Sequence, residues 1–282
     1  MPELPDVEGE RRRFAALAAG RRVRRVTADP TFLRNARPGD LDRALRGRRL
    51  GEPGRWGKWL LCPADGPLLL LHFGMTGGLV AGGAPSPYDR LVLELEGGEL
   101  RVRDVRKLGG AWLARDDEEA RELLRGLGPD ALQVDLGTFL ERLAGRRGGA
   151  KAVLLDQGFV AGIGNLLADE ILWRARIHPR APIPGLDDRA RARLHRAMLG
   201  VLRTSVARIG RPPPAGWLLS VRGEPGARCP RCRTPLARIA AAGRTTYLCP
   251  ACQPPAGAPA GPGPGISGRR AAAPPTTRAA RA

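Results

Sequence analysis

The spacing of apolar residues near the start of the chain predicts a helix over residues 6–19. Val7, Phe14 and Leu17 recur on one face of such a helix, and charged residues fill most positions between them. Gly20 follows, and glycine is common just beyond the C-terminus of a helix. A single helix is therefore expected to lead into the rest of the chain.

From residue 21 to about residue 114 the apolar residues form short runs bounded by glycine and proline. In "RLVLELEGGELRVRDV", apolar and polar residues alternate on both sides of Gly97-Gly98, which allows the tight primed turn of a β-hairpin. Other strands are expected at "RVRRV", "WLLC", "LLLLHF" and "GGLVAG". The region is therefore predicted to form an all-β sandwich or barrel behind the single helix.

After about residue 115 the apolar period is helical again. The first helix of this region is expected to have one apolar face, made of Leu136, Phe139, Leu140 and Leu143. Residues 153–155 and "NLLADEILWRAR" predict two more helices, and a longer one is capped by Asp187 or Asp188.

The pattern as a whole predicts an α+β protein of several domains. We expect a helix with a β-sandwich at 1–114, a linker at 115–135, a helical domain at 136–219 and a cysteine-paired hairpin at 220–253. Residues 254–282 are rich in Pro, Gly and Ala, with four arginines and no acid, and they predict a disordered basic tail.

The charge of the chain points to a polyanionic partner. Its 47 basic and 28 acidic residues give a net charge of +19. An anionic membrane is the competing partner, but no apolar run is long enough to span a bilayer and no signal-peptide pattern is present. Aromatic residues make up only 4%, which favours duplex or backbone binding over a stacking platform for single strands.

Lysine is scarce, because 44 of the 47 basic residues are arginine. A lysine amine can lose its proton and act as a base or nucleophile, which guanidinium effectively cannot. Lys58, Lys107 and Lys151 are therefore candidates for such chemistry, and chance retention is the alternative.

Four of the five cysteines are arranged as a metal site. Cys229 and Cys232 form one C-x2-C pair, and Cys249 and Cys252 form a second pair sixteen residues later. This spacing predicts one structural Zn²⁺ bound by four thiolates, in a reducing compartment, rather than a disulfide framework. Cys62 stands alone.

Three further segments have both a functional and an ordinary interpretation. The glycines of "DQGFVAGIGNLLADE" either bring backbone amides and the start of a helix at Asn165 near a phosphate, or form an ordinary connection. Lys58 is placed on a strand, facing away from Trp59, as an edge charge or a phosphate or catalytic contact. Met75 lies in a glycine-flanked turn, where it either inserts into a base stack or folds back onto the sandwich.

The opening "MPELPDVEG" also has two interpretations. Pro2 is either a rigid lead-in to the helix or, once Met1 is removed, an N-terminal secondary amine that attacks an aldehyde-level carbon. Glu3, the adjacent carboxyl, would then manage the protons.

Six segments in this order resemble the formamidopyrimidine-DNA glycosylase/endonuclease VIII family. They are "PELPDVE", "GKWLL", "HFGMTG", "DVRKLGG", "DQGFVAGIGNLLADEILWRARIHP" and "GRTTYLCPACQ", within residues 2–253. The resemblance implies an N-terminal helix and β-sandwich, a helix-two-turn-helix domain and a C-terminal zinc-finger hairpin. It also implies a bifunctional DNA glycosylase and abasic-site (AP) lyase of base excision repair.

The resemblance assigns roles to residues at matching positions. Pro2 is the nucleophile that attacks C1′ of the damaged nucleotide and forms an iminium, which β- and then δ-elimination resolve, and Glu3 transfers protons. Lys58 contacts the phosphate of the lesion and supports catalysis. The implied contacts with flanking phosphates are Asn165 and Arg244, and the residues that fill the space left by the base are Met75, Arg106 and Leu108.

The sequence departs from the family pattern at three places. Asp6 replaces the usual glutamate, and Leu108 replaces the phenylalanine of the formamidopyrimidine branch. The stretch "IGRPPPAGWLLSVRGEPGARC" lacks the loop associated with capping 8-oxoguanine. We therefore expect weak activity on 8-oxoguanine and a preference for abasic sites, formamidopyrimidines or oxidised pyrimidines.

Duplex DNA with damaged bases or abasic sites is thus the expected partner, bound by a monomer in the bacterial cytoplasm at the nucleoid. The main alternative is a noncatalytic DNA-damage or DNA-structure binding protein on the same scaffold. A more distant alternative is a zinc-ribbon protein that binds structured RNA.

Overall fold

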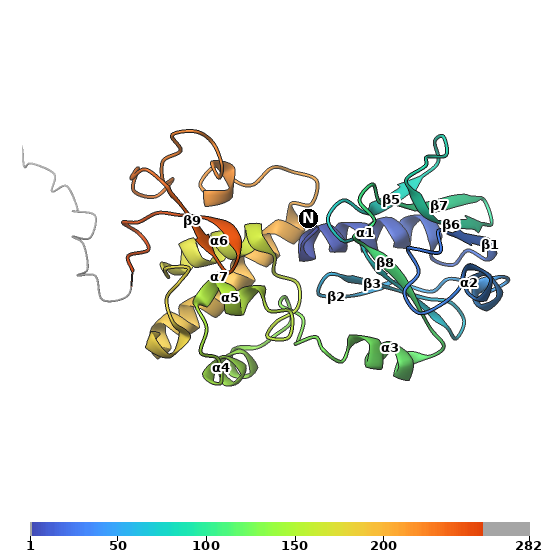
Figure 1. Ribbon diagram of the computed structural model, residues 1–282, viewed down its shortest axis with the longest axis horizontal. Coiled ribbons are helices and arrows are strands. Elements are labelled where there is room, and N and C mark those ends of the chain that lie inside the picture. The colour runs from blue at the N-terminus through green and yellow to red at the C-terminus, as the bar shows by residue number, and fades with distance from the viewer. Residues whose placement is uncertain (1, 256–282) are drawn as a thin grey trace, which may run out of the picture.

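The computed structural model describes residues 2–255, in which a β-sandwich lies beside a group of helices with a small hairpin (Figure 1). The chain starts at the junction of these two halves, as the N label in Figure 1 shows, and helix α1 (Leu4–Ala18) runs from there along the sandwich. Helix α1 contacts strands of both sheets and also α7 of the other half. The first residues of the chain therefore touch both halves.

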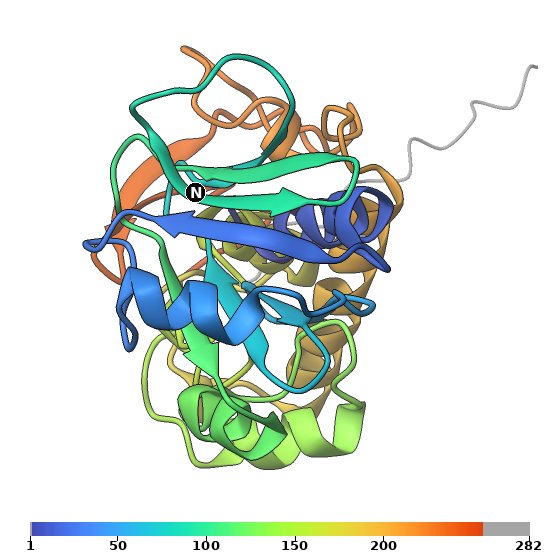
Figure 2. The ribbon, with the colours of Figure 1, turned by 90° about the vertical axis from the view of Figure 1, so that its right-hand side faces the viewer.

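The sandwich has two antiparallel sheets of four strands each (Figure 2). One has the order β1 (Val23–Ala28), β6 (Asp89–Leu95), β7 (Gly98–Arg103) and β5 (Gly78–Ala81). The other has the order β2 (Gly54–Trp56), β3 (Trp59–Pro63), β4 (Leu68–His72) and β8 (Gly110–Ala114).

The predicted hairpin is confirmed as β6 and β7. Leu91, Leu93 and Leu95 are buried, and Leu93 pairs with Leu100 across the two strands. Gly97 and Gly98 have φ of +83° and +149°, a region that side chains rarely adopt, so glycine is required at this turn.

Two helices in the first 135 residues were not expected. Helix α2 (Pro38–Leu45) lies next to β1 (Figure 2), so the prediction of strands alone after the first helix is wrong there. Helix α3 (Asp117–Leu124) falls inside the predicted linker, with Asp116 capping its N-terminus. Both have eight residues, too short for a strong apolar period. The domain boundaries themselves stay predictions.

The helical half contains α4 (Leu136–Ala144), α5 (Ala150–Leu155), α6 (Asn165–Ala175) and α7 (Asp188–Ala207). Short 3₁₀ helices cover Ile183–Gly185 and Leu218–Ser220. Asp187 is the cap of α7, since its side chain accepts from the amide of Ala190. On α4, Phe139 and Leu143 are buried as predicted, but Leu136 is 40% exposed, so the predicted apolar face is too wide.

The C-terminal hairpin consists of β9 (Ala237–Ala241) and β10 (Arg244–Leu248), and β10 packs against α6. Of the predicted basic tail, residues 256–282 lie outside the described residues. None of the helices within residues 2–255 has the length and apolar character needed to cross a membrane.

Candidate active site at the junction of the two halves

Glu3 connects the start of the chain to the helical half. Its carboxylate is buried, with Glu3 only 2% exposed, and it accepts hydrogen bonds from three backbone amides at the start of α6. The donors are Gly164 (3.1 Å), Leu166 (2.8 Å) and Leu167 (3.1 Å). A helix N-terminus offers unpaired amides and a positive potential, so it is a favourable place for a carboxylate.

Two glycines make room for this contact. A Cβ on Gly164 would lie 2.3 Å from Cδ of Glu3, and one on Gly162 would lie 2.5 Å from Cδ1 of Leu4. Gly162 also accepts the amide of Leu4 through its carbonyl, at 3.0 Å. The glycines are therefore required because the start of the chain packs directly on this turn.

The amides of the glycine-rich segment are already occupied within the chain. Gly158 donates to Asp156, Gly162 donates to Gln157 and Gly164 donates to Glu3. The interpretation of these glycine amides as a phosphate site is therefore wrong. The segment instead holds the Glu3 carboxylate.

Lys58 lies in the turn between β2 and β3, and not within a strand as predicted. The preceding Gly57 has φ of +57°, and a Cβ there would lie 2.6 Å from Ala161, so the turn packs closely on the helical half. Its amide donates to Asp130 at 2.8 Å, and Arg55 forms an ion pair with the same carboxylate. These contacts fix the half-buried Lys58 beside the start of α6.

Lys58 interacts electrostatically with both Glu3 and Arg244. Burial raises the pKa of Glu3 above its usual range, and the three amides and Lys58 only partly oppose this. Burial likewise lowers the pKa of Lys58; Glu3 opposes that shift and the charge of Arg244 adds to it. The site thus holds a carboxyl whose pKa is raised and an amine whose pKa is lowered, so both titrate closer to neutral pH than exposed side chains of the same kind.

Asn165 and Arg244 approach this site from α6 and β10. Asn165 is the first residue of α6, and its Nδ2 donates to the carbonyl of Thr245 at 3.2 Å. Its Oδ1 is buried and has no hydrogen-bond partner among the described residues. Arg244 is exposed at the start of β10. Pro2 is half-buried directly before Glu3. The structure therefore brings together Pro2, Glu3, Lys58, Asn165 and Arg244.

A buried ion pair that the sequence did not reveal holds β10 against α6. Lys151 is fully buried on α5, and its Nζ lies 2.6 Å from Asp169 on α6 and 2.7 Å from Oγ1 of Thr246 on β10. Arg222 also contacts Asp169, at 2.8 Å. The scarcity of lysine singled out Lys151, but only the fold shows that it joins three elements.

The remaining predicted DNA contacts lie on loops of the sandwich. Met75 (37%) and Leu108 (49%) are exposed apolar side chains, and Nη1 of the exposed Arg106 lies 3.8 Å from Sδ of Met75. These three residues are brought together. The prediction that Met75 protrudes rather than covers the core agrees with its exposure.

The four cysteines fit a zinc ion. Their Sγ atoms all lie within 4.8 Å of one another, and three of the pairs are 3.4, 3.5 and 3.9 Å apart. Tetrahedral Zn²⁺ with sulfur at about 2.3 Å places its ligands about 3.8 Å apart. Cys229 also accepts a hydrogen bond from Nε1 of Trp173 at 3.4 Å, as a thiolate would. Four protein thiolates complete a tetrahedral shell, so the zinc is structural.

A cavity opens beside Glu3 on the side of residues 208–219. Its lining includes Asp6, Leu166, Ile209, Pro212, Pro213, Pro214 and Trp217. Oδ2 of Asp6 accepts the amide of Glu3 at 2.8 Å, so the shorter carboxylate that departs from the family pattern caps the first helix.

Models of three domains match the chain. The formamidopyrimidine-DNA glycosylase N-terminal domain matches residues 1–111, the H2TH domain of the same enzyme matches 126–211, and the zinc finger found in FPG and IleRS matches 226–255. The chain belongs to the formamidopyrimidine-DNA glycosylase family. It is therefore a DNA glycosylase of base excision repair, as the resemblance implied.

Individual relatives agree with this assignment. The formamidopyrimidine-DNA glycosylase of Geobacter sulfurreducens is 38% identical in an alignment of 270 positions that covers 90% of this chain and 100% of the relative. The structure of the MutM (FPG) protein of Thermus thermophilus is 37% identical, with a TM-score of 0.77, and covers 90% of this chain and 99% of that one. The Lactococcus lactis Fpg in complex with abasic-site DNA is 29% identical, with a TM-score of 0.80, and covers 89% and 99%.

Proposed function

We propose that this glycosylase is bifunctional and uses Pro2 as its nucleophile, with Glu3 as its proton-transfer group. The observation that carries this proposal is the position of the Glu3 carboxylate. It directly follows Pro2, lies almost entirely buried on the amides of α6 and interacts with Lys58. A buried carboxyl next to a potential secondary amine suits nucleophilic attack at a sugar carbon with assisted proton transfer.

The chemistry follows from the amine. With Met1 removed, Pro2 carries a free amine, and such α-amines have a pKa near about 8, so an appreciable fraction is unprotonated at neutral pH. The amine nitrogen forms a bond to C1′ while the bond from C1′ to the base breaks, and the base leaves with that electron pair and takes up a proton. Opening of the sugar gives an iminium, which acidifies the C2′ proton and permits β- and then δ-elimination of the phosphates.

Glu3 is suited to moving these protons. Because burial raises its pKa, Glu3 takes up a proton at a higher pH than an exposed glutamate does. It can therefore give a proton to the sugar ring oxygen and recover one later in the reaction. Lys58, whose pKa burial lowers, contacts the phosphate of the lesion.

The contacts with flanking phosphates are assigned to two residues of the helical half. Asn165 and Arg244 contact the phosphates that flank the lesion through donors, which are the second hydrogen of the Asn165 Nδ2 group, beside the one bonded to Thr245, and an exposed guanidinium. The net charge of +19 supports a nonspecific search of DNA before the lesion is found.

The enzyme acts as a monomer on chromosomal DNA at the nucleoid in the bacterial cytoplasm.

Met75, Arg106 and Leu108, which we call the wedge, enter the space left by the everted base. Their mutual contact and exposure support this role. A duplex hides C1′, so eversion must come before chemistry, and a damaged or mispaired base costs less to extrude.

The cavity beside Glu3 receives the everted base, and its composition supports the expected lesion preference. Three consecutive prolines, Pro212 to Pro214, form part of its wall, and proline has no backbone N–H to donate. Arg174 lies 4.6 Å from the ring centroid of Trp217 and Glu170 accepts the amide of Leu219, so this wall is held in place. The proline part of the wall favours recognition by shape over backbone hydrogen bonding to 8-oxoguanine, and the lining also has side-chain donors in Ser205, Arg208 and Arg211.

The experiment that tests this proposal is borohydride trapping on duplexes with one lesion each. The panel contains an abasic site, 8-oxoguanine, a formamidopyrimidine and an oxidised pyrimidine, with wild type compared with Pro2→Gly. We expect a covalent adduct in wild type, weakest with 8-oxoguanine, and its loss or severe slowing in Pro2→Gly while DNA binding stays nearly intact.

Two results would contradict the proposal. If zinc and duplex binding are intact but wild type forms no adduct with any lesion, the protein is a noncatalytic binder of damaged DNA. If 8-oxoguanine gives the strongest adduct, the proline-lined wall does not limit the substrate range.

A further inference from the structure

The wedge residues lie on two separate loops that share one buried carboxylate. Asp104 is fully buried at the end of β7, between the turn that carries Met75 and the loop that carries Arg106 and Leu108. Its Oδ1 accepts from Oγ1 of Thr76 (2.6 Å) and from the amide of Arg106 (3.1 Å). Its Oδ2 accepts from the amide of Gly109 (2.9 Å). We call this arrangement the Asp104 clasp.

The clasp holds the two loops in direct backbone contact. A Cβ on Gly74, whose φ is +58°, would lie 2.4 Å from the carbonyl carbon of Leu108 and from the amide nitrogen of Gly109. The residues beside Met75 and beside Leu108 therefore touch through their main chains. Because the two backbones are this close, the loops cannot move independently without breaking the bonds to Asp104.

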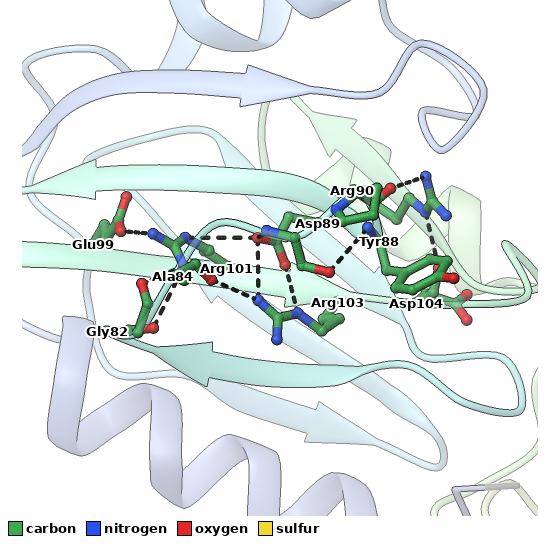
Figure 3. Close-up of polar contacts among 12 residues, drawn as sticks. Gly82, Ala84, Tyr88, Asp89, Arg90, Glu99, Arg101, Arg103 and Asp104 are labelled. Atoms are coloured by element: carbon green, nitrogen blue, oxygen red, sulfur yellow. Dashed lines mark hydrogen bonds and ion pairs between the residues drawn. The ribbon is translucent and has the colours of Figure 1, made fainter.

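The position of Asp104 itself is fixed by its main chain. Its amide donates to the carbonyl of Tyr88 at 2.9 Å, and Nε of Arg90 donates to its carbonyl at 2.8 Å, as Figure 3 shows. Arg90 is held in turn by the carboxylate of Asp29, at 3.2 Å. Asp104 is thus attached to the sheet and does not move with the loops.

The same network orients the tip of the wedge loop. Lys107 lies between Arg106 and Leu108 with φ of +53°, and its Nζ pairs with Oδ2 of Asp29 at 2.8 Å. This ion pair turns the Lys107 side chain toward Asp29. The two wedge residues on either side of Lys107 remain exposed.

Hydrogen bonds keep the Asp104 carboxylate ionised. Burial alone would raise the pKa of Asp104, but the bonds from Thr76, Gly109 and Arg106 outweigh it and hold that pKa below its usual range. An ionised carboxylate accepts at both oxygens, whereas an amide accepts at only one. Only a carboxylate can therefore satisfy all three donors, because an amide oxygen in the place of Oδ1 would leave the amide of Gly109 facing an NH₂ group.

We propose that Asp104 is a positioning residue that joins the two loops of the wedge into one preformed unit, so that Met75, Arg106 and Leu108 enter the DNA stack together. Asp104 is buried and touches no DNA. This inference rests on the proposed wedge role and deepens it, because it assigns the alignment of the three residues to a carboxylate behind them. Losing the clasp separates the loops and slows insertion, while phosphate contacts on the other half remain.

The test uses the full-length protein and a duplex with 2-aminopurine opposite a tetrahydrofuran site, which no amine can cleave through an iminium. The fluorescence change after mixing reports insertion beside the estranged base. Asp104→Asn should slow that change about tenfold or more, the loss expected when a hydrogen bond to a charged group is removed. Asp89→Asn is the matched control, since Asp89 pairs with Arg103 on the same sheet (Figure 3) and contacts neither loop. It should change the rate by about twofold or less.

The outcomes separate this inference from the proposed chemistry. An unchanged rate in Asp104→Asn, or an equal loss in Asp89→Asn, would overturn the positioning role. A wild type that shows the fluorescence change but forms no borohydride adduct would refute the Pro2 mechanism and leave the clasp standing. If Asp104→Asn does not fold, Thr76→Val removes one of the three bonds, and it should slow insertion by a smaller factor. An unchanged rate there would contradict the inference.

Discussion

The ion pairs of Asp89 in the sandwich join neighbouring strands of one sheet, whereas the Lys151–Asp169 pair of the helical half joins separate elements inside the core. Asp89 on β6 pairs with Arg103 on the neighbouring β7, and the Arg103 side chain stays 32% exposed (Figure 3). Lys151 and Asp169 are instead fully buried between α5, α6 and β10. Removing one partner of a buried pair costs about 3–5 kcal/mol, far more than at a surface. The packing of β10 against α6 is thus fixed by a buried ion pair.

This difference shows how the site is divided. The helical half supplies fixed groups: the amides of α6, Asn165 and Arg244. The sandwich supplies residues on loops and turns, which are Lys58 and the wedge, held by hydrogen bonds such as those to Asp104. Glu3 belongs to both halves, because it follows Pro2 at the start of α1 but receives its hydrogen bonds from α6. The site exists only when the two halves meet.

The largest effect is expected from removing one zinc ligand of the C-terminal hairpin. Cys249→Ser should release zinc and unfold the hairpin, because small metal sites of this kind depend on the ion for folding. Strand cleavage should be lost with the hairpin, while the sandwich stays folded. Metal analysis and hydrogen exchange of the purified protein measure both effects. An undiminished zinc content would refute the four-thiolate site.

A smaller effect is expected from Gly164→Ala, which disturbs the contact between Glu3 and the start of α6 but changes no core residue. Gly164 has φ of −118°, which any residue adopts, so Gly164→Ala acts through the 2.3 Å approach to Glu3 alone. Displacing Glu3 by about 1 Å should slow cleavage about 100-fold, with nearly normal DNA binding. Single-turnover assays on an abasic duplex measure this loss.

Gly200→Ala on α7 is the matched control for that substitution. A Cβ there has no neighbour within 4 Å, so the variant should keep full activity and gain up to about 1 kcal/mol of stability. If both variants cleave at the wild-type rate, Glu3 does not need its position on α6.

The smallest effect is expected at the surface of the hairpin. Arg244→Ala removes an exposed guanidinium and leaves the buried Lys151–Asp169 pair intact. Because phosphates are the same beside every lesion, DNA binding should weaken about equally for every lesion. The slope of log affinity against log salt should fall by about 1, as for one lost phosphate contact. Fluorescence anisotropy at several salt concentrations measures this. A loss confined to one lesion would mean that Arg244 reads the base.

The sequence was most informative where the signal was local. The cysteine spacing, the Gly97-Gly98 hairpin and the start of α6 at Asn165 follow from patterns of a few residues, and the structure agrees with each. The helices α2 and α3 have only eight residues each, too short for an apolar period to distinguish helix from strand. Lys58 was assigned to a strand because a two-residue turn interrupts the alternation there.

What could not be predicted depends on contacts distant in the chain. Gly164 looked like part of a phosphate site until the fold brought Glu3 onto it, 161 residues away in sequence. Lys151 lies outside the six segments of the resemblance, and Asp104 lies in "DVRKLGG" without an assigned role. Their roles come from Asp169 and Thr246 in one case and from two loops in the other.

The central claim, that Pro2 attacks the DNA beside a Glu3 carboxylate held at the junction, can be tested directly by mapping the trapped adduct. The wild-type protein is reduced with borohydride on an abasic duplex and digested, and its peptides are analysed by mass spectrometry. Our account predicts a chain that begins at Pro2 and carries the sugar adduct on that residue. An adduct on Lys58 or another lysine, or a bound complex without any adduct, would contradict it.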